Sequence, residues 1–103
     1  MAFGLSNEVV TRIVRVFESS HKVQRVLLFG SRSLGRHREG SDIDLALEGD
    51  FDFNDILEFR IKLEDLMLPY SFDLVELTES LDPSLREHIL RAGVVIFDRR
   101  TNK

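Results

Sequence analysis

The sequence predicts an α/β or α+β domain in which a small mixed sheet carries packed helices. Apolar runs of strand length alternate along the chain with segments whose apolar residues recur at helical spacing. A length of 103 residues suits a single domain. An apolar fraction of 43% with 31% charged residues is typical of a water-soluble fold with a real core. We therefore expect one domain over residues 1–103, with helices covering a sheet.

The first half of the chain predicts a helix, a strand, a loop and a second strand. Residues 6–20 place apolar side chains at helical spacing, behind a Ser and an Asn that can cap the helix. The Val- and Leu-rich segment 23–29 stops at Gly30 and suits a buried strand. A loop rich in Gly, Ser, Arg and His follows. Residues 42–47 then have the length and the Ile and Leu content of another strand.

The middle of the chain returns to helical spacing. Residues 52–67 predict a helix that Asp52 caps and Pro69 closes. One apolar stripe along this helix is expected to face the core. The stripe consists of Phe53, Ile56, Phe59 or Arg60, Leu63 and Met67.

The last part of the chain predicts a strand, a helix and a final strand. Residues 71–77 form the third apolar run of strand length. Asp82-Pro83 is a cap followed by proline at the first helical position, and this helix is expected to end near Gly93. Residues 94–97 are then the fourth strand, and residues 98–103 are expected to form a polar tail.

Composition argues against several classes of function. The net charge of -4 disfavours a broad basic surface for a nucleic-acid polymer, although a local basic cluster can still hold one phosphate chain. The absence of cysteine removes disulfides, thiolate metal sites and thiol catalysis. The sequence has neither an uninterrupted apolar run of about 18 residues nor a signal-like N-terminal segment. We therefore expect no membrane span and a cytoplasmic location.

The loop and the strand that follows it carry residues typical of phosphate chemistry. Gly30 at a strand end lets backbone approach a phosphate, and Ser31 adds a hydroxyl donor beside it. Asp42 and Asp44 share one face of the second strand, because successive side chains alternate between faces. Two carboxylates held this close repel each other unless a cation lies between them. Mg²⁺ is the oxygen-binding cation that also binds triphosphate, so the pair predicts Mg²⁺.

Two further residues extend this candidate site. Asp73 is a lone acid in an apolar strand, where the cost of desolvation predicts a partner, and we interpret it as a third metal ligand or a base. Arg32 is the loop arginine that we favour for neutralising phosphate charge. Plainer alternatives stand beside these interpretations: an acidic outward strand face, a structurally satisfied acid, a simple turn at the strand end and a solvated basic loop.

The spacing of these residues resembles that of a known family. Residues 30–31 (Gly-Ser), ten intervening residues, residues 42–45 (Asp-Ile-Asp-Leu) and a later Asp73 resemble the signature of the DNA polymerase β-type nucleotidyltransferases. More narrowly, segments 30–35 and 41–45 resemble the minimal nucleotidyltransferases (MNT) of prokaryotes. The departures from the family pattern, which commonly has alanine and arginine there, are Ser33 and Leu34.

This resemblance implies a nucleotidyltransferase fold with two sets of functional residues. One set would bind the nucleotide, ATP, and Gly30 and Ser31 would contact its triphosphate. The full nucleotide-binding set is Gly30, Ser31, Arg32 and Ser41. The other set would ligate two Mg²⁺ ions and be catalytic, with its last member helping to activate the acceptor hydroxyl. That set is Asp42, Asp44 and Asp73.

Three functions follow as hypotheses. The first is enzymatic: an acceptor hydroxyl attacks the α-phosphate of a nucleoside triphosphate in line, and pyrophosphate leaves. The resemblance implies that AMP is transferred to a helical HEPN-type toxin, which would make the chain an antitoxin. The second hypothesis is a binding module that neutralises its partner by complex formation, with a vestigial nucleotide site. The third is a nucleotidyltransferase that modifies aminoglycoside-type antibiotics. The sequence leaves a homo-oligomer open.

Overall fold

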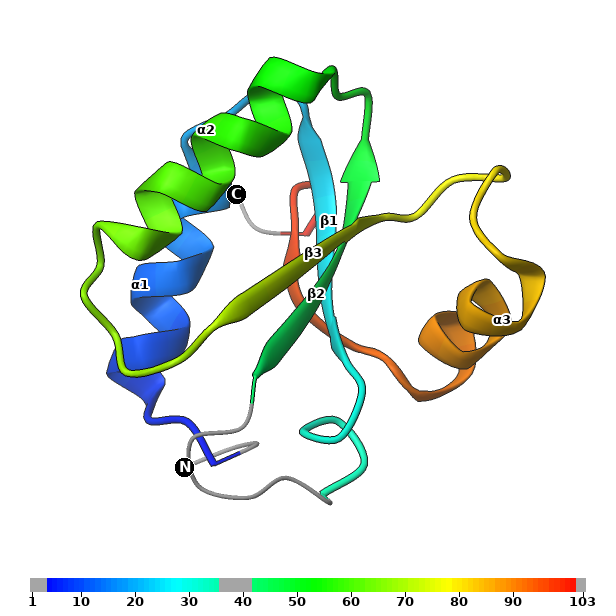
Figure 1. Cartoon of the computed structure of the whole chain (residues 1–103), viewed down its shortest axis with the longest axis horizontal. Coiled ribbons are helices and arrows are strands. Elements are labelled where there is room, and N and C mark those ends of the chain that lie inside the picture. The colour runs from blue at the N-terminus through cyan, green and yellow to red at the C-terminus, as the bar shows by residue number, and fades with distance from the viewer. Residues whose placement is uncertain (1–3, 36–41, 102–103) are drawn as a thin grey trace.

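The computed structural model describes residues 4–35 and 42–101 of the chain. Within this part the chain forms three helices and four strands (Figure 1). They are α1 (Asn7–Glu18), β1 (Val23–Phe29), β2 (Ile43–Gly49), α2 (Phe53–Glu64), β3 (Phe72–Glu76), α3 (Pro83–Ala92) and β4 (Val94–Asp98). The order of elements predicted from the sequence is therefore confirmed.

The four strands form one mixed sheet in the order β3-β2-β1-β4. Strand β1 pairs antiparallel with both β2 and β4, whereas β2 and β3 are parallel. Parallel neighbours need a crossover connection, and α2 supplies it between β2 and β3. Because of these directions, β2 and β3 begin at the same end of the sheet, beside the point where β1 ends.

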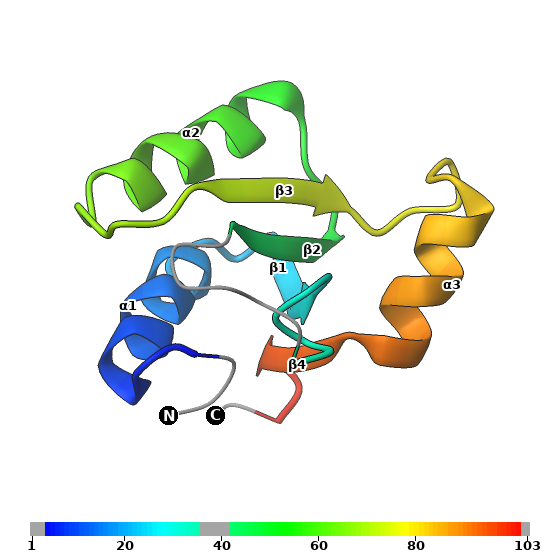
Figure 2. The same ribbon diagram turned by 60° about the horizontal axis from the view of Figure 1, so that its bottom comes forward.

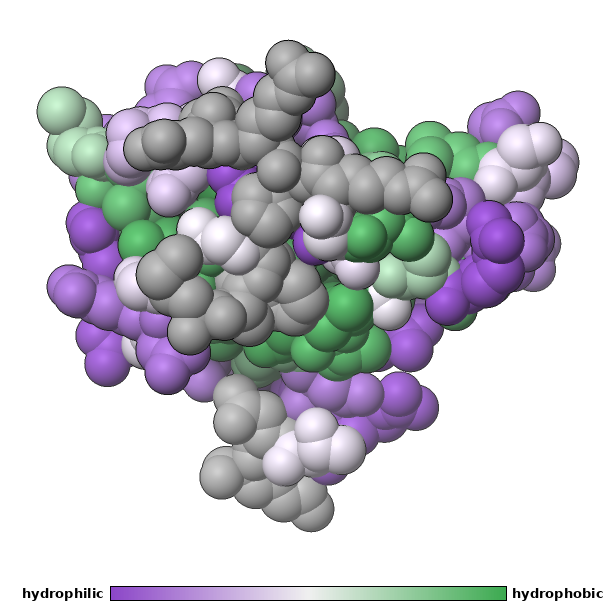
Figure 3. All heavy atoms as spheres, turned by 90° about the horizontal axis from the view of Figure 1, so that it is seen from below, coloured by the Kyte–Doolittle hydropathy of each residue, from purple (hydrophilic) through white to green (hydrophobic). Residues whose placement is uncertain are grey.

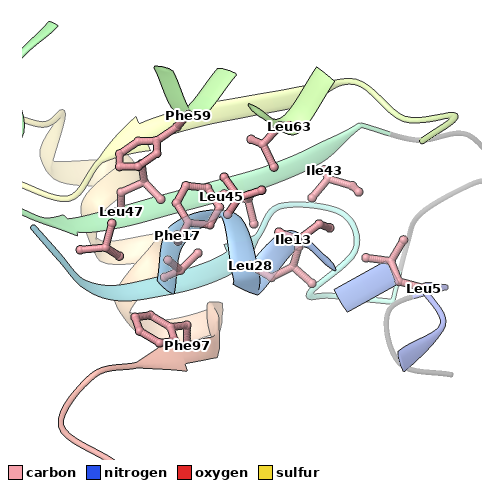
Figure 4. Packing of buried hydrophobic residues seen from close by; sticks show 13 residues of the cluster. Leu5, Ile13, Phe17, Leu28, Ile43, Leu45, Leu47, Phe59, Leu63 and Phe97 are labelled. Atoms are coloured by element: carbon pink, nitrogen blue, oxygen red, sulfur yellow. The ribbon is translucent and has the colours of Figure 1, made fainter. Parts of the chain in front are cut away.

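The two faces of the sheet are covered differently. Helices α1 and α2 lie on one face and α3 lies on the other (Figure 2). Side chains from α1, α2 and the strands form the main core, where the rings of Phe17 and Phe59 lie 5.2 Å apart (Figure 4). On the other face a smaller cluster joins Ile89 of α3 to residues of β1 and β2. The smaller cluster does not include the first residues of β2 and β3.

Each helix begins at a side-chain cap that the sequence indicates. The Ser6 hydroxyl accepts the Val9 amide of α1 at 3.2 Å. At α2, Asp52 and Asp55 bond to each other's backbone amides in a reciprocal capping box. At α3 the Asp82 carboxylate accepts the Leu85 amide at 3.0 Å, and proline follows at the first helical position. Caps of this kind typically contribute about 0.5 to 2 kcal/mol each.

Helix α2 ends at Glu64, three residues before the end at residue 67 that the sequence predicts. The chain leaves the helix through Met67, whose φ is 57°. Arg12 of α1 donates a 2.6 Å hydrogen bond from Nη2 to the carbonyl of Leu66 and so fixes this turn. The early ending has a physical cause, because a tertiary contact from α1 stops the helix where the local sequence would let it continue.

The apolar stripe predicted for α2 is also narrower in the structure. Phe59 and Leu63 are buried and Ile56 packs against the same core. By contrast, 79% of Phe53 and 86% of Met67 are exposed. Phe53 is the first helical residue and Met67 lies beyond the last turn, so neither end of the stripe reaches the sheet. The prediction that these two residues face the core is wrong.

The predicted polar tail begins too early. Strand β4 includes Asp98, and Arg99 is bound to the body of the protein. The Arg99 side chain donates to the carbonyl of Val23 at 2.8 Å and to that of Ser20 at 2.7 Å, and its guanidinium carbon lies 5.2 Å from the Phe97 ring centroid. These contacts hold the chain after β4 against the turn that follows α1.

The exposed surface of α3 carries several charged side chains beside the exposed Leu90. Seen from the end of the molecule where β1 stops, hydrophilic side chains gather at the flanks, including the side on which α3 lies (Figure 3). Arg86, Glu87 and Arg91 of α3 are all exposed.

In the described segments, none of the helices has the length and apolar character that crossing a bilayer requires.

Candidate nucleotidyltransferase site

The loop after β1 turns back directly behind the strand. Gly30 has a φ of 78°, and its carbonyl accepts bonds from the Leu34 amide at 3.3 Å and the Ser33 hydroxyl at 2.9 Å. The first amides of such a turn have no carbonyl partner within it, which makes them suitable donors to an anion. Ser31 is half-buried at the start of this turn. Residues 30–35 therefore form a compact turn in the first part of the loop that the sequence predicts between the two strands.

Three aspartates stand on the sheet face that carries α3. Asp44 pairs with Phe29 of β1 on one side and with Asp73 of β3 on the other. Asp42 comes directly before β2, two residues ahead of Asp44, so strand alternation puts both side chains on the same face. The structure therefore pairs Asp44 with Asp73 on neighbouring strands and puts Asp42 two residues ahead of Asp44.

The carboxyl groups of this cluster act on one another. Burial raises the pKa of Asp44, and the charge of Asp73, a side-chain hydrogen bond to Asp73 and the charge of Asp42 raise it further. Asp42 and Asp73 are exposed, whereas Asp44 is half-buried. The ionised form of the central carboxyl is thus disfavoured by both dehydration and like charge. Such a group favours either a proton or a cation beside it.

Gly30 is required at the site by Asp44. A β-carbon added to Gly30 would overlap Oδ2 of Asp44 and lie 3.2 Å from its Cγ. The positive φ of Gly30 adds a second obstacle to any side chain there. The sequence suggests that this glycine leaves room for a phosphate. The structure adds that it leaves room for the carboxylate in the middle of the acidic cluster.

The remaining candidate residues lie in different surroundings. Arg32 is 2% exposed, and its guanidinium carbon lies 4.9 Å from the centroid of the Tyr70 ring. Contact between Arg32 and phosphate stays a prediction. Ser41 lies outside the described residues. Tyr70 is the residue that sequence reasoning missed, because an aromatic ring just before a strand is indistinguishable from an ordinary core residue by spacing alone.

A family model supports the same interpretation of the fold. The model, described as polymerase beta, nucleotidyltransferase, matches residues 11–102. The chain belongs to the polymerase beta-type nucleotidyltransferase family. The match spans every strand of the sheet and all three aspartates, so the resemblance seen in the sequence is confirmed at the level of the family.

Individual relatives of this nucleotidyltransferase agree with the family match. A candidate protein adenylyltransferase of Methanocaldococcus jannaschii is 26% identical over 99 residues, which cover 87% of this chain and 96% of the relative. A toxin-antitoxin structure with AMP-PNP contains a chain with a TM-score of 0.70 and 26% identity, over 95% of this chain and 77% of that chain. A complex of tri-AMPylated HEPN toxin of Shewanella oneidensis with MNT antitoxin shares the fold, with a TM-score of 0.70, 23% identity and coverage of 95% and 76%.

The donor set of this nucleotidyltransferase fits a hard divalent cation in its chemistry. Asp44 and Asp73 supply carboxylate oxygens whose mutual repulsion a cation would relieve. Among the described residues, however, no group of three or more potential ligands lies close enough together to hold an ion. The acidic pair is present in the fold, and ligation by all three aspartates stays a prediction.

Proposed function

We propose that this chain transfers AMP from ATP to a hydroxyl group of a HEPN-type partner protein and thereby acts as an antitoxin. The observation that carries the proposal is the pairing of Asp44 with Asp73 across β2 and β3, directly beside the Gly30 loop. Two similar structures support the choice of nucleotide and partner. One contains AMP-PNP in a toxin-antitoxin complex, and the other contains an AMPylated HEPN toxin with its MNT antitoxin.

In this proposal the loop binds the triphosphate and the aspartates bind the metal. Gly30 and Ser31 contact the triphosphate through the backbone and a hydroxyl group, and Ser41 is proposed as a further contact. The proposed ligands of Mg²⁺ are Asp42, Asp44 and Asp73. Bound Mg²⁺ would offset phosphate charge and stabilise the attacking and leaving oxygens. Because these carboxylates repel one another, ATP and metal are expected to bind together rather than separately.

The reaction is a substitution at the α-phosphorus of ATP. The acceptor oxygen forms a bond to that phosphorus while the bond to the bridging oxygen of the β-phosphate breaks, and pyrophosphate leaves with the electron pair. Asp73 is exposed on the edge strand of the sheet, where an acceptor can reach it. It orients the acceptor hydroxyl and takes its proton. Asp44, between the loop and Asp73, would ligate the Mg²⁺ that binds the phosphate end of the substrate.

Transfer of label from α-labelled ATP to a purified HEPN-type toxin tests this function. Asp73→Asn should keep ATP affinity but lower the transfer rate by about 10² to 10⁴-fold, the usual worth of general acid-base catalysis. Glu76→Gln is the matched control, because it removes a carboxylate from the same exposed strand at a position that faces the other way. A normal rate in Asp73→Asn, or an equal loss in Glu76→Gln, would remove Asp73 from the catalytic assignment.

One observation favours a second candidate, a binding module that neutralises its partner by complex formation. The described residues include no assembled group of three metal ligands. Wild-type protein that binds both ATP and the toxin, protects against the toxin and transfers no label would support this alternative. Label on the toxin at one or more hydroxyl groups would exclude it.

A further inference from the structure

Arg32 is the one charged side chain that the described part of the chain buries almost completely. Only 2% of it is exposed, and its guanidinium lies 4.9 Å from the centroid of the Tyr70 ring. This distance is within the range of about 6 Å over which a cation is attracted to the face of an aromatic ring. Burying a cation is costly unless its surroundings compensate. The free-energy cost of burying Arg32 must therefore be offset by the groups around its guanidinium, and the Tyr70 ring is one of them.

The contact joins two segments that the sheet separates. Arg32 belongs to the loop that leaves β1, and Tyr70 lies two residues before β3. In the sheet, β2 lies between β1 and β3. The carbonyl of Ser71 also accepts the amide of Ile43 at 2.9 Å, which ties the Tyr70 segment to the start of β2. The Arg32 and Tyr70 contact thus spans the point at which β2 begins, next to Asp44.

Tyr70 is itself held in place from behind. Its side chain packs against the main core that α1 and α2 build on the sheet. The segment before it is fixed by the hydrogen bond from Arg12 of α1 to the carbonyl of Leu66. The ring is therefore part of the rigid body of the protein. Arg32, in contrast, belongs to a loop. Its contact with Tyr70 therefore fixes the loop relative to the core.

We propose that Arg32 and Tyr70 are positioning residues that hold the Gly30 loop in a fixed place relative to Asp73. The proposal rests on the transfer reaction proposed above, in which the loop binds the triphosphate and Asp73 faces the acceptor. If the two parts are held together, the α-phosphorus and the acceptor oxygen stay aligned. A misplacement of about 1 Å in such a site can cost about 10²-fold in rate. Arg32 then acts through the loop and not as a direct phosphate ligand.

Four variants of the whole chain and one control variant test this assignment with α-labelled ATP and the HEPN-type toxin. Tyr70→Leu and Arg32→Met should each lower the single-turnover transfer rate by about 10 to 10²-fold, while ATP affinity changes by less than about threefold. Tyr70→Phe keeps the aromatic ring and should stay within about twofold of wild type. The double variant should be no worse than Arg32→Met alone, because Arg32→Met already removes the contact that Tyr70→Leu removes. Met67→Ala, at an exposed neighbouring position, is the unaffected control.

Hydrogen exchange supplies a measurement that does not need activity. The amides of Leu34 and Gly35 are bonded within the loop, to the carbonyls of Gly30 and Arg32. They should lose protection in Tyr70→Leu and Arg32→Met but keep it in Tyr70→Phe. If wild-type protein transfers no label, the proposed function fails and the exchange data alone decide the positioning role.

Two results would overturn the positioning role. One is unchanged exchange of the loop amides in Tyr70→Leu at a normal melting temperature. The other is a strong loss of ATP affinity in Arg32→Met that Tyr70→Leu does not share, with additive losses in the double variant. The second result would make Arg32 a direct ligand of the phosphates, acting independently of Tyr70.

Discussion

The two faces of β2 differ sharply although their residues alternate along one strand. Ile43, Leu45 and Leu47 are 0 to 1% exposed and belong to the main core under α1 and α2. On the opposite face, Asp42 and Asp44 belong to an acidic cluster that no helix covers completely. Four residues of β2 and the aspartate directly before it thus contribute to folding on one side and to chemistry on the other. Substitutions one residue apart should have opposite kinds of effect.

The largest effect is expected from Asp44→Asn. This change removes the central carboxylate, so transfer of label to the toxin should fall by about 10²-fold or more. Asparagine keeps the size of the side chain, and folding should be preserved. Transfer rate and circular dichroism should be measured on the same sample. A folded variant with normal transfer would show that the acidic face is not the reaction site.

Leu45→Ala should produce the reverse pattern. Leu45 is fully buried between the sheet and the two helices, so shortening it leaves a cavity. The free energy of unfolding should fall by about 2 to 5 kcal/mol, measured by urea denaturation. At low temperature, where the variant is still folded, transfer per folded molecule should be close to wild type. A selective loss of transfer without loss of stability would contradict the division between the faces.

Gly30→Ala and Gly35→Ala separate backbone strain from contact with the acids. Both glycines have a positive φ, but a β-carbon at Gly35 meets nothing within 4 Å, whereas at Gly30 it overlaps the Asp44 carboxylate. Gly35→Ala should cost about 1 to 2 kcal/mol for the strained φ alone. Gly30→Ala should cost more and also weaken ATP binding, as calorimetry can measure. Equal losses of stability and unchanged ATP affinity would remove the Asp44 contact as the reason for Gly30.

The smallest expected effect is a pH dependence of stability in the metal-free protein. The pKa of Asp44 is raised in the folded state, so folding binds a proton there. Its contribution to stability is fully present below the ordinary pKa of about 4 and is lost as pH rises through the raised value. With chelator present, Asp44→Asn should therefore melt above wild type at pH 7, and the difference should shrink toward pH 4. A variant that melts below wild type at pH 7 would contradict this sign.

Local patterns were sufficient to predict the elements and the acids they carry. Strand β1 matches its prediction residue for residue, because a Val- and Leu-rich run stops at a glycine that must adopt a positive φ. The caps of all three helices follow from single side chains and their neighbours. Asp42 and Asp44 were assigned to one face by the strand period alone. These features depend on residues close together in the chain.

Relations between distant segments could not be predicted in the same way. The pairing of Asp44 with Asp73 depends on the parallel register of β2 and β3, which α2 sets as a crossover and no local pattern encodes. The contact of Arg32 with Tyr70 depends on the same arrangement. The end of α2 was misplaced because Arg12, far away in sequence, binds the carbonyl after its last turn. In each case a contact between segments far apart in the sequence decides among conformations that the local sequence allows equally well.

The position of β3 at the edge of the sheet also bears on solubility. Within the described residues this strand has a neighbour on one side only, so its outer backbone is open to a strand from another molecule. Charged side chains on such a strand discourage intermolecular pairing, and β3 carries Asp73 and Glu76, both exposed. The carboxylate proposed to take the acceptor proton therefore also acts as a gatekeeper against aggregation. Neutralising Asp73 would therefore make pairing with a strand of another molecule easier, and it would also remove the proposed base from the reaction.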